Sequence, residues 1–112
     1  MNAETNKSES ATVYILTKAV QRKTPLFSLG AVVATPGAVD LLDRAGINAT
    51  PFLARHQYGD FGALDADDIR ENQLSIERGS RILSAYEING ERIWIITEAD
   101  RSVTTMLLPQ EY

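Results

Sequence analysis

The chain has 112 residues, and 44% of them are hydrophobic, which is enough for one buried core without disulfides or structural metals. It contains no cysteine, so disulfides and thiolate metal sites are excluded. The net charge is −4, from 11 basic and 15 acidic residues, so the chain as a whole does not attract a phosphate polymer. A role on nucleic acid would therefore need a local basic patch.

The N-terminal residues bear on localisation. Residues 1–10 are polar and lack the apolar stretch of a secretion signal, and no run in the chain approaches the length of a membrane span. We therefore predict a cytoplasmic protein that does not bind membranes. Residues 1–10 are also predicted to be disordered, and residues 11–112 are predicted to form a single α+β domain.

Two segments before the first predicted helix have strand character. Residues 12–20 (TVYILTKAV) contain β-branched and aromatic residues that suit a strand, although a helix fits this run nearly as well, and the two alternatives stay open. After a short basic loop, residues 26–34 are mostly apolar and indicate either a short strand or a buried segment that leads into a helix.

Three short helices are predicted from their start and stop residues. Thr35 is followed by Pro36, which indicates a capped helix over residues 35–45 that ends at Gly46. The pair Thr50 and Pro51 repeats this pattern and predicts a helix to about residue 56. A third helix is expected to start at a capping aspartate and to end before a glycine; its bounds are 65–78.

The clearest pattern is a β-hairpin in the C-terminal third. Asn89-Gly90 is the pair that best tolerates a two-residue type I′ turn, and it predicts that residues 82–88 pair with 91–97. A slip of one residue would invert both faces and break two charge pairs. These pairs lie at the two ends of the hairpin: Glu87 with Arg92, and Arg81 with Glu98.

A second hairpin is predicted from the turn at residues 99–102, which leads into a strand at 103–108. It sets Thr97 opposite Thr104 and Trp94 opposite Leu107. The predicted fold is therefore α+β. An N-terminal strand and two to three short helices pack on one face of a three- to four-stranded antiparallel meander.

His56 is the first candidate for chemistry, because it is the only histidine and the only side chain expected to titrate near neutral pH. It lies at the end of a predicted helix. Its ring could act as a general acid or base with a partner from elsewhere in the fold, or its N–H could simply cap helical carbonyls. The sequence leaves both interpretations open.

A second candidate is a group of polar residues on one face of the predicted meander, which we take to be partly exposed. Strand alternation places hydroxyl groups together there, and the following turn adds a charged rim that could bind an anion or a substrate. The alternative is ordinary cross-strand pairing and turn chemistry. The residues are Ser84, Tyr86, Thr97 and Thr104 on the face, and Asp100, Arg101 and Ser102 at the rim.

No metal or cofactor is predicted. The acidic residues Asp60, Asp65, Asp67 and Asp68 lack the alternating ligand spacing of a calcium loop, and helix capping explains the last three better. A single histidine without cysteine does not support a zinc site, and the chain has no glycine-rich phosphate loop.

From residue 26 onward the chain resembles a known family. The runs that carry the resemblance are LGAVVATPGAVDLLDRAG, LARHQYGDFGALDADD, RILSAY and IWIITEADRSVTTMLLPQEY, with Asn72 after the second run. They resemble small bacterial proteins of unknown function that are carried on plasmids, phages and other mobile elements. The run ITEADRS, followed by TT and LLP, is the most specific part.

The layout of helices before a meander more distantly resembles the barnase–EndoU–colicin–RelE group of ribonucleases, which cleave RNA without a metal. This resemblance implies His56 as acid/base and Arg101 as the phosphate ligand. It implies hydrogen-bond donation to the phosphate by Ser102, Thr97 or Thr104.

Three hypotheses about function follow. The chain is an accessory protein of a mobile element that binds a protein partner, with an anti-defence or regulatory role, and its acidic Asp65–Asp68 surface would face a basic partner. Alternatively, it is a metal-independent ribonuclease that binds RNA. A third hypothesis is a homodimer formed through an exposed sheet face.

Overall fold

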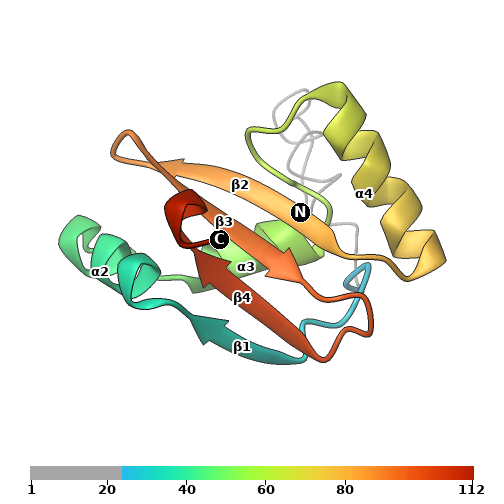
Figure 1. The fold of residues 1–112 in the computed structure, drawn as a ribbon, viewed down its shortest axis with the longest axis horizontal. Helices are drawn as coiled ribbons and strands as arrows, with labels where there is room; N and C mark the ends of the chain where they lie inside the picture. The colour runs from blue at the N-terminus through green and yellow to red at the C-terminus, as the bar shows by residue number, and fades with distance from the viewer. Residues whose placement is uncertain (1–23) are drawn as a thin grey trace, which may run out of the picture.

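The computed structural model describes residues 24–112. The predictions for residues 1–10 and 12–20, and the domain boundary at residue 11, lie outside this range and stay predictions. The elements in chain order are β1 (Ala31–Ala34), α2 (Pro36–Ala45), α3 (Thr50–Gln57), α4 (Ala66–Arg78), β2 (Ile82–Ile88), β3 (Glu91–Thr97), β4 (Val103–Leu107) and the short 3₁₀ helix η1 (Pro109–Glu111) (Figure 1). None of the helices in residues 24–112 has the length and hydropathy needed to cross a bilayer.

The strands form one sheet in the order β1-β4-β3-β2. The strands β2, β3 and β4 make the predicted antiparallel meander, so the α+β class is confirmed. β1 pairs with β4 in parallel, which makes the sheet mixed. This parallel pairing is possible because the connection between β1 and the meander contains three helices, and such a long crossover can return the chain in the same direction.

The predicted hairpin register is confirmed. Ile82 pairs with Thr97 and Ile88 pairs with Glu91, and the turn residues Asn89 and Gly90 have φ values of 51° and 83°, as a type I′ turn requires. The second hairpin also has the predicted partners. Thr97 lies opposite Thr104, and Trp94 opposite Leu107.

The predicted helix ends are confirmed for α2 and α4. The Thr35 hydroxyl accepts a hydrogen bond from the Ala38 amide, and the Asp65 carboxylate accepts one from the Asp68 amide. The prediction that Thr50 caps α3 was wrong. Thr50 is the first residue of that helix, and its amide donates instead to the Asn48 side chain at 3.0 Å.

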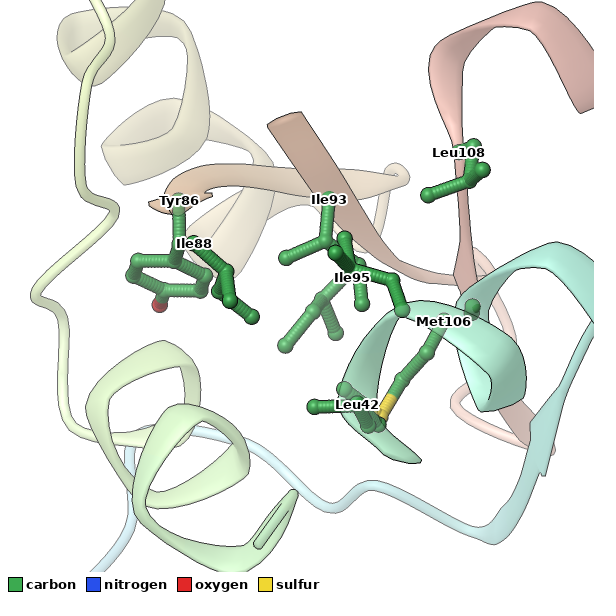
Figure 2. Packing of buried hydrophobic residues seen from close by; sticks show 9 residues of the cluster. Leu42, Tyr86, Ile88, Ile93, Ile95, Met106 and Leu108 are labelled. Atoms are coloured by element: carbon green, nitrogen blue, oxygen red, sulfur yellow. The ribbon is translucent and has the colours of Figure 1, made fainter. Parts of the chain in front are cut away.

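Helices α2 and α3 cover one face of the sheet, which we call the helix face. In Figure 1, α3 lies behind the sheet, whereas η1 lies in front of β3. Figure 2 shows the main core cluster on the helix face, where isoleucines of β2 and β3 point toward Leu42 of α2 and Met106 of β4. A smaller cluster, at the α4 end of the sheet, holds Phe27, Phe61 and Ile82, with Ile69 and Ile76 of α4 packed on it.

The opposite face, which we call the open face, carries Leu83 of β2 and Trp94 and Ile96 of β3. Among residues 24–112, only η1 and the adjoining C-terminal Tyr112 lie over it. The two faces thus differ in the way that alternation predicts, but helices cover the face with the hydroxyl residues. The expectation that this polar face is partly exposed was wrong, because Ser84, Thr97 and Thr104 are all fully buried.

β2 is an edge strand of the sheet, and part of its outer edge is hydrogen-bonded to other segments of the chain. The Asn72 amide group of α4 donates to the Leu83 carbonyl at 2.6 Å and accepts from the Leu83 amide at 3.1 Å. Two residues further along, Ala85 exchanges backbone hydrogen bonds with Phe61 and Ala63. These contacts prevent another strand from pairing with this part of the edge.

Candidate functional site

His56 lies near the C-terminal end of α3 with no exposed surface. The ring is held between two phenylalanines in edge-on geometry. Its centroid is 5.1 Å from that of Phe27 and 6.5 Å from that of Phe61. These surroundings are apolar and exclude water, so the two ring nitrogens need hydrogen-bond partners within the core.

Both ring nitrogens have such partners. Nδ1 lies 2.6 Å from Oγ of Ser84, and Nε2 lies 2.9 Å from Oγ1 of Thr97. Thr97 Oγ1 in turn lies 2.7 Å from Oγ1 of Thr104, which donates to the Leu29 carbonyl at 2.7 Å. We call this set, from Ser84 through His56 and Thr97 to Thr104, the buried polar chain.

The directions of these hydrogen bonds follow from counting protons. The one hydroxyl proton of Thr104 goes to the Leu29 carbonyl, so Thr97 must donate to Thr104. Thr97 then accepts from His56, which places the ring proton on Nε2. Nδ1 is left as the acceptor for the Ser84 hydroxyl. The buried polar chain therefore fixes a neutral imidazole in one tautomer.

Burial lowers the pKa of His56 from 6.5 to about 4, because the charged ring would lose its hydration. This result contradicts the expectation that His56 titrates near neutral pH. Protonation would also put a second N–H on Nδ1, where Ser84 now donates. The neutral ring accepts one hydrogen bond and donates another, and neither nitrogen is left for a substrate.

Arg101 was predicted to hold a phosphate, but its guanidinium binds backbone carbonyls. Nη1 donates to the carbonyls of Ser80 and Glu98 at 2.6 and 3.0 Å, and Nη2 donates to that of Ser75 at 2.9 Å. Ser75 lies in the last turn of α4, where a cation is favourable because the helix dipole is negative there. Arg101 thus joins the end of α4 to the β3–β4 turn.

The neighbours of Arg101 stabilise the same turn. The Asp100 carboxylate accepts hydrogen bonds from the Ser102 amide at 3.0 Å and the Ser102 hydroxyl at 2.6 Å. The Ser102 hydroxyl, followed by the backbone amides, holds the pKa of Asp100 below its ordinary value. These are the hydrogen bonds of an Asx turn, which is the alternative that the sequence left open.

Tyr86 lies on the same face of β2 as Ser84, and its hydroxyl is within hydrogen-bonding reach of the Ser84 side chain at one end of the buried polar chain. This hydroxyl donates to the Asp60 carbonyl at 2.6 Å, and the guanidinium of Arg55 lies over the tyrosine ring at 4.5 Å. Burial raises the pKa of Tyr86 to about 12. Arg55 also pairs with the Asp60 carboxylate at 2.7 Å. The tyrosine therefore anchors the loop after α3.

Of the predicted site residues, the structure brings together His56, Ser84, Thr97 and Thr104 as the buried polar chain. Tyr86 lies next to Ser84 and bonds to the Asp60 loop, whereas Arg101, Asp100 and Ser102 lie in a separate turn. Within residues 24–112 no group of three or more His, Cys, Asp or Glu side chains could hold a metal ion.

One accessible groove, which the sequence analysis did not predict, lies on the open face. It has a volume of about 260 Å³, and its lining is mostly apolar. The groove is lined by Arg81, Leu83, Trp94, Ile96 and Tyr112. The Tyr112 ring meets Trp94 edge-on at 5.7 Å, and its hydroxyl accepts a hydrogen bond from Arg81 at 2.9 Å. Alternation along the hairpin places Leu83, Trp94 and Ile96 on one face, but it gives no sign that Tyr112 lines the groove with them.

Comparison with protein-family models, with curated proteins and with solved structures finds no match to this chain.

Proposed function

We propose that this chain is a binding protein rather than an enzyme, and that its open face is the binding surface. The observation that supports this proposal is the accessible, mostly apolar groove between the half-buried Trp94 and Leu83 and the exposed Tyr112. The resemblance to proteins of plasmids and phages supports an accessory role on a mobile element, and anti-defence activity or regulation are two forms of that role.

The composition of the open face supports a protein partner. Trp, Tyr and Arg are the residues that most often dominate the energy of protein–protein interfaces, and Trp94, Tyr112 and Arg81 lie next to one another here. Isolated apolar residues on a surface need no explanation, whereas here Leu83, Trp94 and Tyr112 line one groove together with Arg81. The acidic surface of α4 offers less, since Asp65 caps the helix and Asp67 pairs with Arg70.

The buried polar chain argues against the ribonuclease hypothesis. A general acid or base must reach the proton that it transfers, either directly or through one water molecule. The ring of His56 is buried, and both its nitrogens bond to side chains of the core. Arg101 has its guanidinium on backbone carbonyls, so the residues implied by the ribonuclease resemblance have structural partners.

The first experiment separates binding from catalysis. Purified protein is incubated with total cellular RNA in EDTA beside a Thr97→Val variant, which removes one partner of His56. We expect the RNA to remain intact in both samples. Cleavage by the wild type that leaves cyclic-phosphate ends, and that the folded variant lacks, would overturn the binding proposal.

The second experiment locates the binding surface. Wild type, Leu83→Lys and Val39→Lys are immobilised and exposed to a bacterial lysate, and all three are first tested for unchanged folding. Val39 is the control because it is an exposed apolar residue on α2, away from the open face. A protein retained by the wild type and by Val39→Lys but not by Leu83→Lys supports the proposal. Equal retention by all three would place binding elsewhere.

A further inference from the structure

The outer edge of β2 is hydrogen-bonded over only part of its length. Leu83 and Ala85 direct their backbone N–H and C=O groups outward, where Asn72 and the loop after α3 bind them. Because the backbone groups of every second residue in a strand point to the same side, Glu87 also directs its N–H and C=O outward. Neither group has a partner among residues 24–112. Glu87 is therefore available for two backbone hydrogen bonds with an extended segment.

A pocket with a volume of about 400 Å³ lies beside this unpaired part of the edge. This size is within the range of about 300 to 1,000 Å³ that is usual for small-ligand sites. The pocket shares no lining residue with the groove on the open face. Its walls come from the end of α3, the loop that follows and β2, and they are formed by Arg55, Asp60, Gly62, Ala63, Tyr86 and Glu87.

Arg55 supplies the positive charge of this pocket, and two neighbours hold its guanidinium in place. Nε and Nη2 donate to the two carboxylate oxygens of Asp60, at 2.7 and 3.3 Å. One face of the guanidinium lies 4.5 Å from the centroid of the Tyr86 ring. Tyr86 is fixed in turn, because its hydroxyl donates to the Asp60 carbonyl. Arg55 is thus positioned before any ligand arrives.

Asp60 occupies only one edge of this guanidinium. The N–H groups on the other edge, which Nη1 shares with Nη2, have no partner among the described residues. The Arg55 side chain is 44% exposed, so a ligand can reach this edge. Two parallel N–H donors on a planar cation match the two oxygens of a carboxylate.

We propose that this pocket binds a carboxylate joined to a main-chain amide, as at the C-terminus of an extended peptide. The carboxylate accepts from the free edge of Arg55, and the amide exchanges hydrogen bonds with Glu87 in the manner of an added strand. An acidic side chain next to a main-chain amide has the same chemistry, and the experiment below separates these two sources. The proposal does not depend on the binding role of the open face.

The acidic residues of the pocket make this binding weak without preventing it. Both oxygens of Asp60 accept from Arg55, and Oδ1 also accepts from the Gly62 amide at 3.2 Å. The Glu87 side chain lies on the opposite face of β2 from Tyr86 and pairs with Arg92 at 3.5 Å. Glu87 therefore offers the ligand its backbone. Because the charges of Arg55 and Asp60 cancel, we expect a dissociation constant of roughly 1 mM for a short peptide.

The test titrates the full chain with three peptides and follows the NMR shifts of the Ala63 and Glu87 amides. The first peptide is acetyl-Ser-Val-Ala with a free C-terminal carboxylate, and the second is the same peptide with a C-terminal amide. The third is acetyl-Ser-Val-Asp amide, whose only carboxylate is in the side chain. We expect the second peptide to bind at least roughly tenfold more weakly than the first or the third, because it has no carboxylate.

The pattern of binding identifies the source of the carboxylate. Tighter binding of the first peptide than of the third indicates a peptide C-terminus, and the reverse order indicates an acidic side chain. Equal binding of all three peptides, or no shift with any of them up to about 10 mM, would overturn the proposal.

Two matched substitutions test the cation. Arg55→Gln removes it, and Arg70→Gln is the control because Arg70 also forms an exposed ion pair with an aspartate, at 3.2 Å from Asp67. Both variants lose one positive charge. Arg55→Gln should bind the preferred peptide roughly tenfold more weakly or worse, whereas Arg70→Gln should bind it like the wild type. The same affinity in both variants would contradict the assignment of Arg55.

A second pair of variants tests the strand edge and leaves Arg55 in place. Glu87→Ala and Glu87→Pro both lose the carboxylate, but only the proline variant loses the N–H. An edge strand tolerates proline where the N–H points away from the sheet, and circular dichroism checks that both variants fold. Glu87→Pro should bind roughly fivefold more weakly than Glu87→Ala, as followed at Ala63. Equal binding by these two variants would exclude strand addition. Leu83→Lys should leave peptide binding unchanged, so failure of the open-face proposal is a separate result.

Discussion

Nε2 of His56 lies 2.9 Å from Oγ1 of Thr97, and this contact uses the only N–H of the ring. The Thr97 hydroxyl donates a hydrogen bond to Thr104, whose hydroxyl donates to the Leu29 carbonyl. Residues of the types that a ribonuclease uses are thus assembled into a fully bonded network inside the core. Such a network favours one packing arrangement of α3 on the sheet, because any other leaves buried polar groups without partners.

The first prediction concerns the stability of His56→Ala. The substitution removes a fully buried ring and leaves Ser84 and Thr97 without their partner. We expect the free energy of unfolding to fall by about 3 kcal/mol or more, from the cavity and the unpaired hydroxyls together. Urea denaturation measures the change.

The control for this prediction is Gln73→Ala, an exposed position of α4, which should change stability by less than about 0.5 kcal/mol. A small loss for His56→Ala, similar to that of the control, would contradict the structural role of the ring. It would instead fit a catalytic residue that contributes little to folding.

The second prediction is the pH dependence of stability. The pKa of His56 is about 4 in the folded protein and about 6.5 in the unfolded chain, so between these values the unfolded state binds more protons. Stability due to the neutral ring is therefore complete above about pH 6.5 and is lost as the pH falls toward 4, to a total of about 3 kcal/mol. Urea denaturation at several pH values measures this slope.

His56→Gln provides the comparison for the second prediction, because it keeps polar atoms but does not titrate. The variant should be less stable at pH 7 and should lack most of the slope between pH 6.5 and 4. The carboxylates with lowered pKa values, Asp60, Asp100 and Glu111, lose their contributions at lower pH in both proteins. Equal slopes in the two proteins would show that His56 does not carry the effect.

The sequence predicted the local parts of this fold well, because they depend on neighbouring residues. The Asn89-Gly90 turn fixed the hairpin register, and the start and stop residues fixed α2 and α4. It did not predict which face of the sheet the helices cover, since both faces carry apolar residues. That choice depends on helix packing, and it decides whether His56, Ser84 and Thr97 form a surface site or a core network.

The role of Arg101 was also beyond the sequence, because two of its three carbonyl partners come from distant segments. The three carbonyls belong to α4, to the β2 approach and to the β3–β4 turn, and nothing in the run Asp-Arg-Ser indicates them. A cationic side chain next to hydroxyl residues predicts an anion site only if its donors are free. Backbone carbonyls occupy them here.

The third prediction compares three substitutions of Arg101, which has a left-handed φ of 62°. Arg101→Ala loses the bonds to three carbonyls and should destabilise the fold by about 2 kcal/mol or more. Arg101→Gly loses the same bonds, but its backbone accepts this φ, so it should be about 1 kcal/mol more stable than the alanine variant. Thermal denaturation ranks the variants.

Arg101→Lys tests whether the position needs the guanidinium group or only a positive charge. A lysine keeps the positive charge, but its single ammonium group lacks the planar, forked donors that a guanidinium directs at three carbonyls. The Arg101→Lys variant should therefore be destabilised nearly as much as the alanine variant. Near wild-type stability for Arg101→Lys, together with a loss of stability for Arg101→Ala, would mean that charge rather than hydrogen-bond geometry is what the position needs.

The fourth prediction uses two glycines with the same backbone angle and different surroundings. Gly62 has a φ of 75°, and a Cβ there would lie 2.1 Å from the Ala85 carbonyl oxygen. Gly79 has a φ of 74°, and nothing lies within 4 Å of its Cβ position. Gly79→Ala should therefore cost only the left-handed conformation, about 1 kcal/mol. Gly62→Ala must also separate the Phe61–Ala63 segment from β2, which breaks the hydrogen bonds of Ala85.

We expect Gly62→Ala to be destabilised by about 3 kcal/mol or more, since lost hydrogen bonds and displaced packing add to the backbone cost. Hydrogen exchange should show faster exchange at the Ala85 and Ala63 amides in this variant and no change there in Gly79→Ala. Similar stability losses for the two variants would mean that the contact between the loop and β2 contributes little. In that case the edge of β2 would depend on Asn72 alone for its protection.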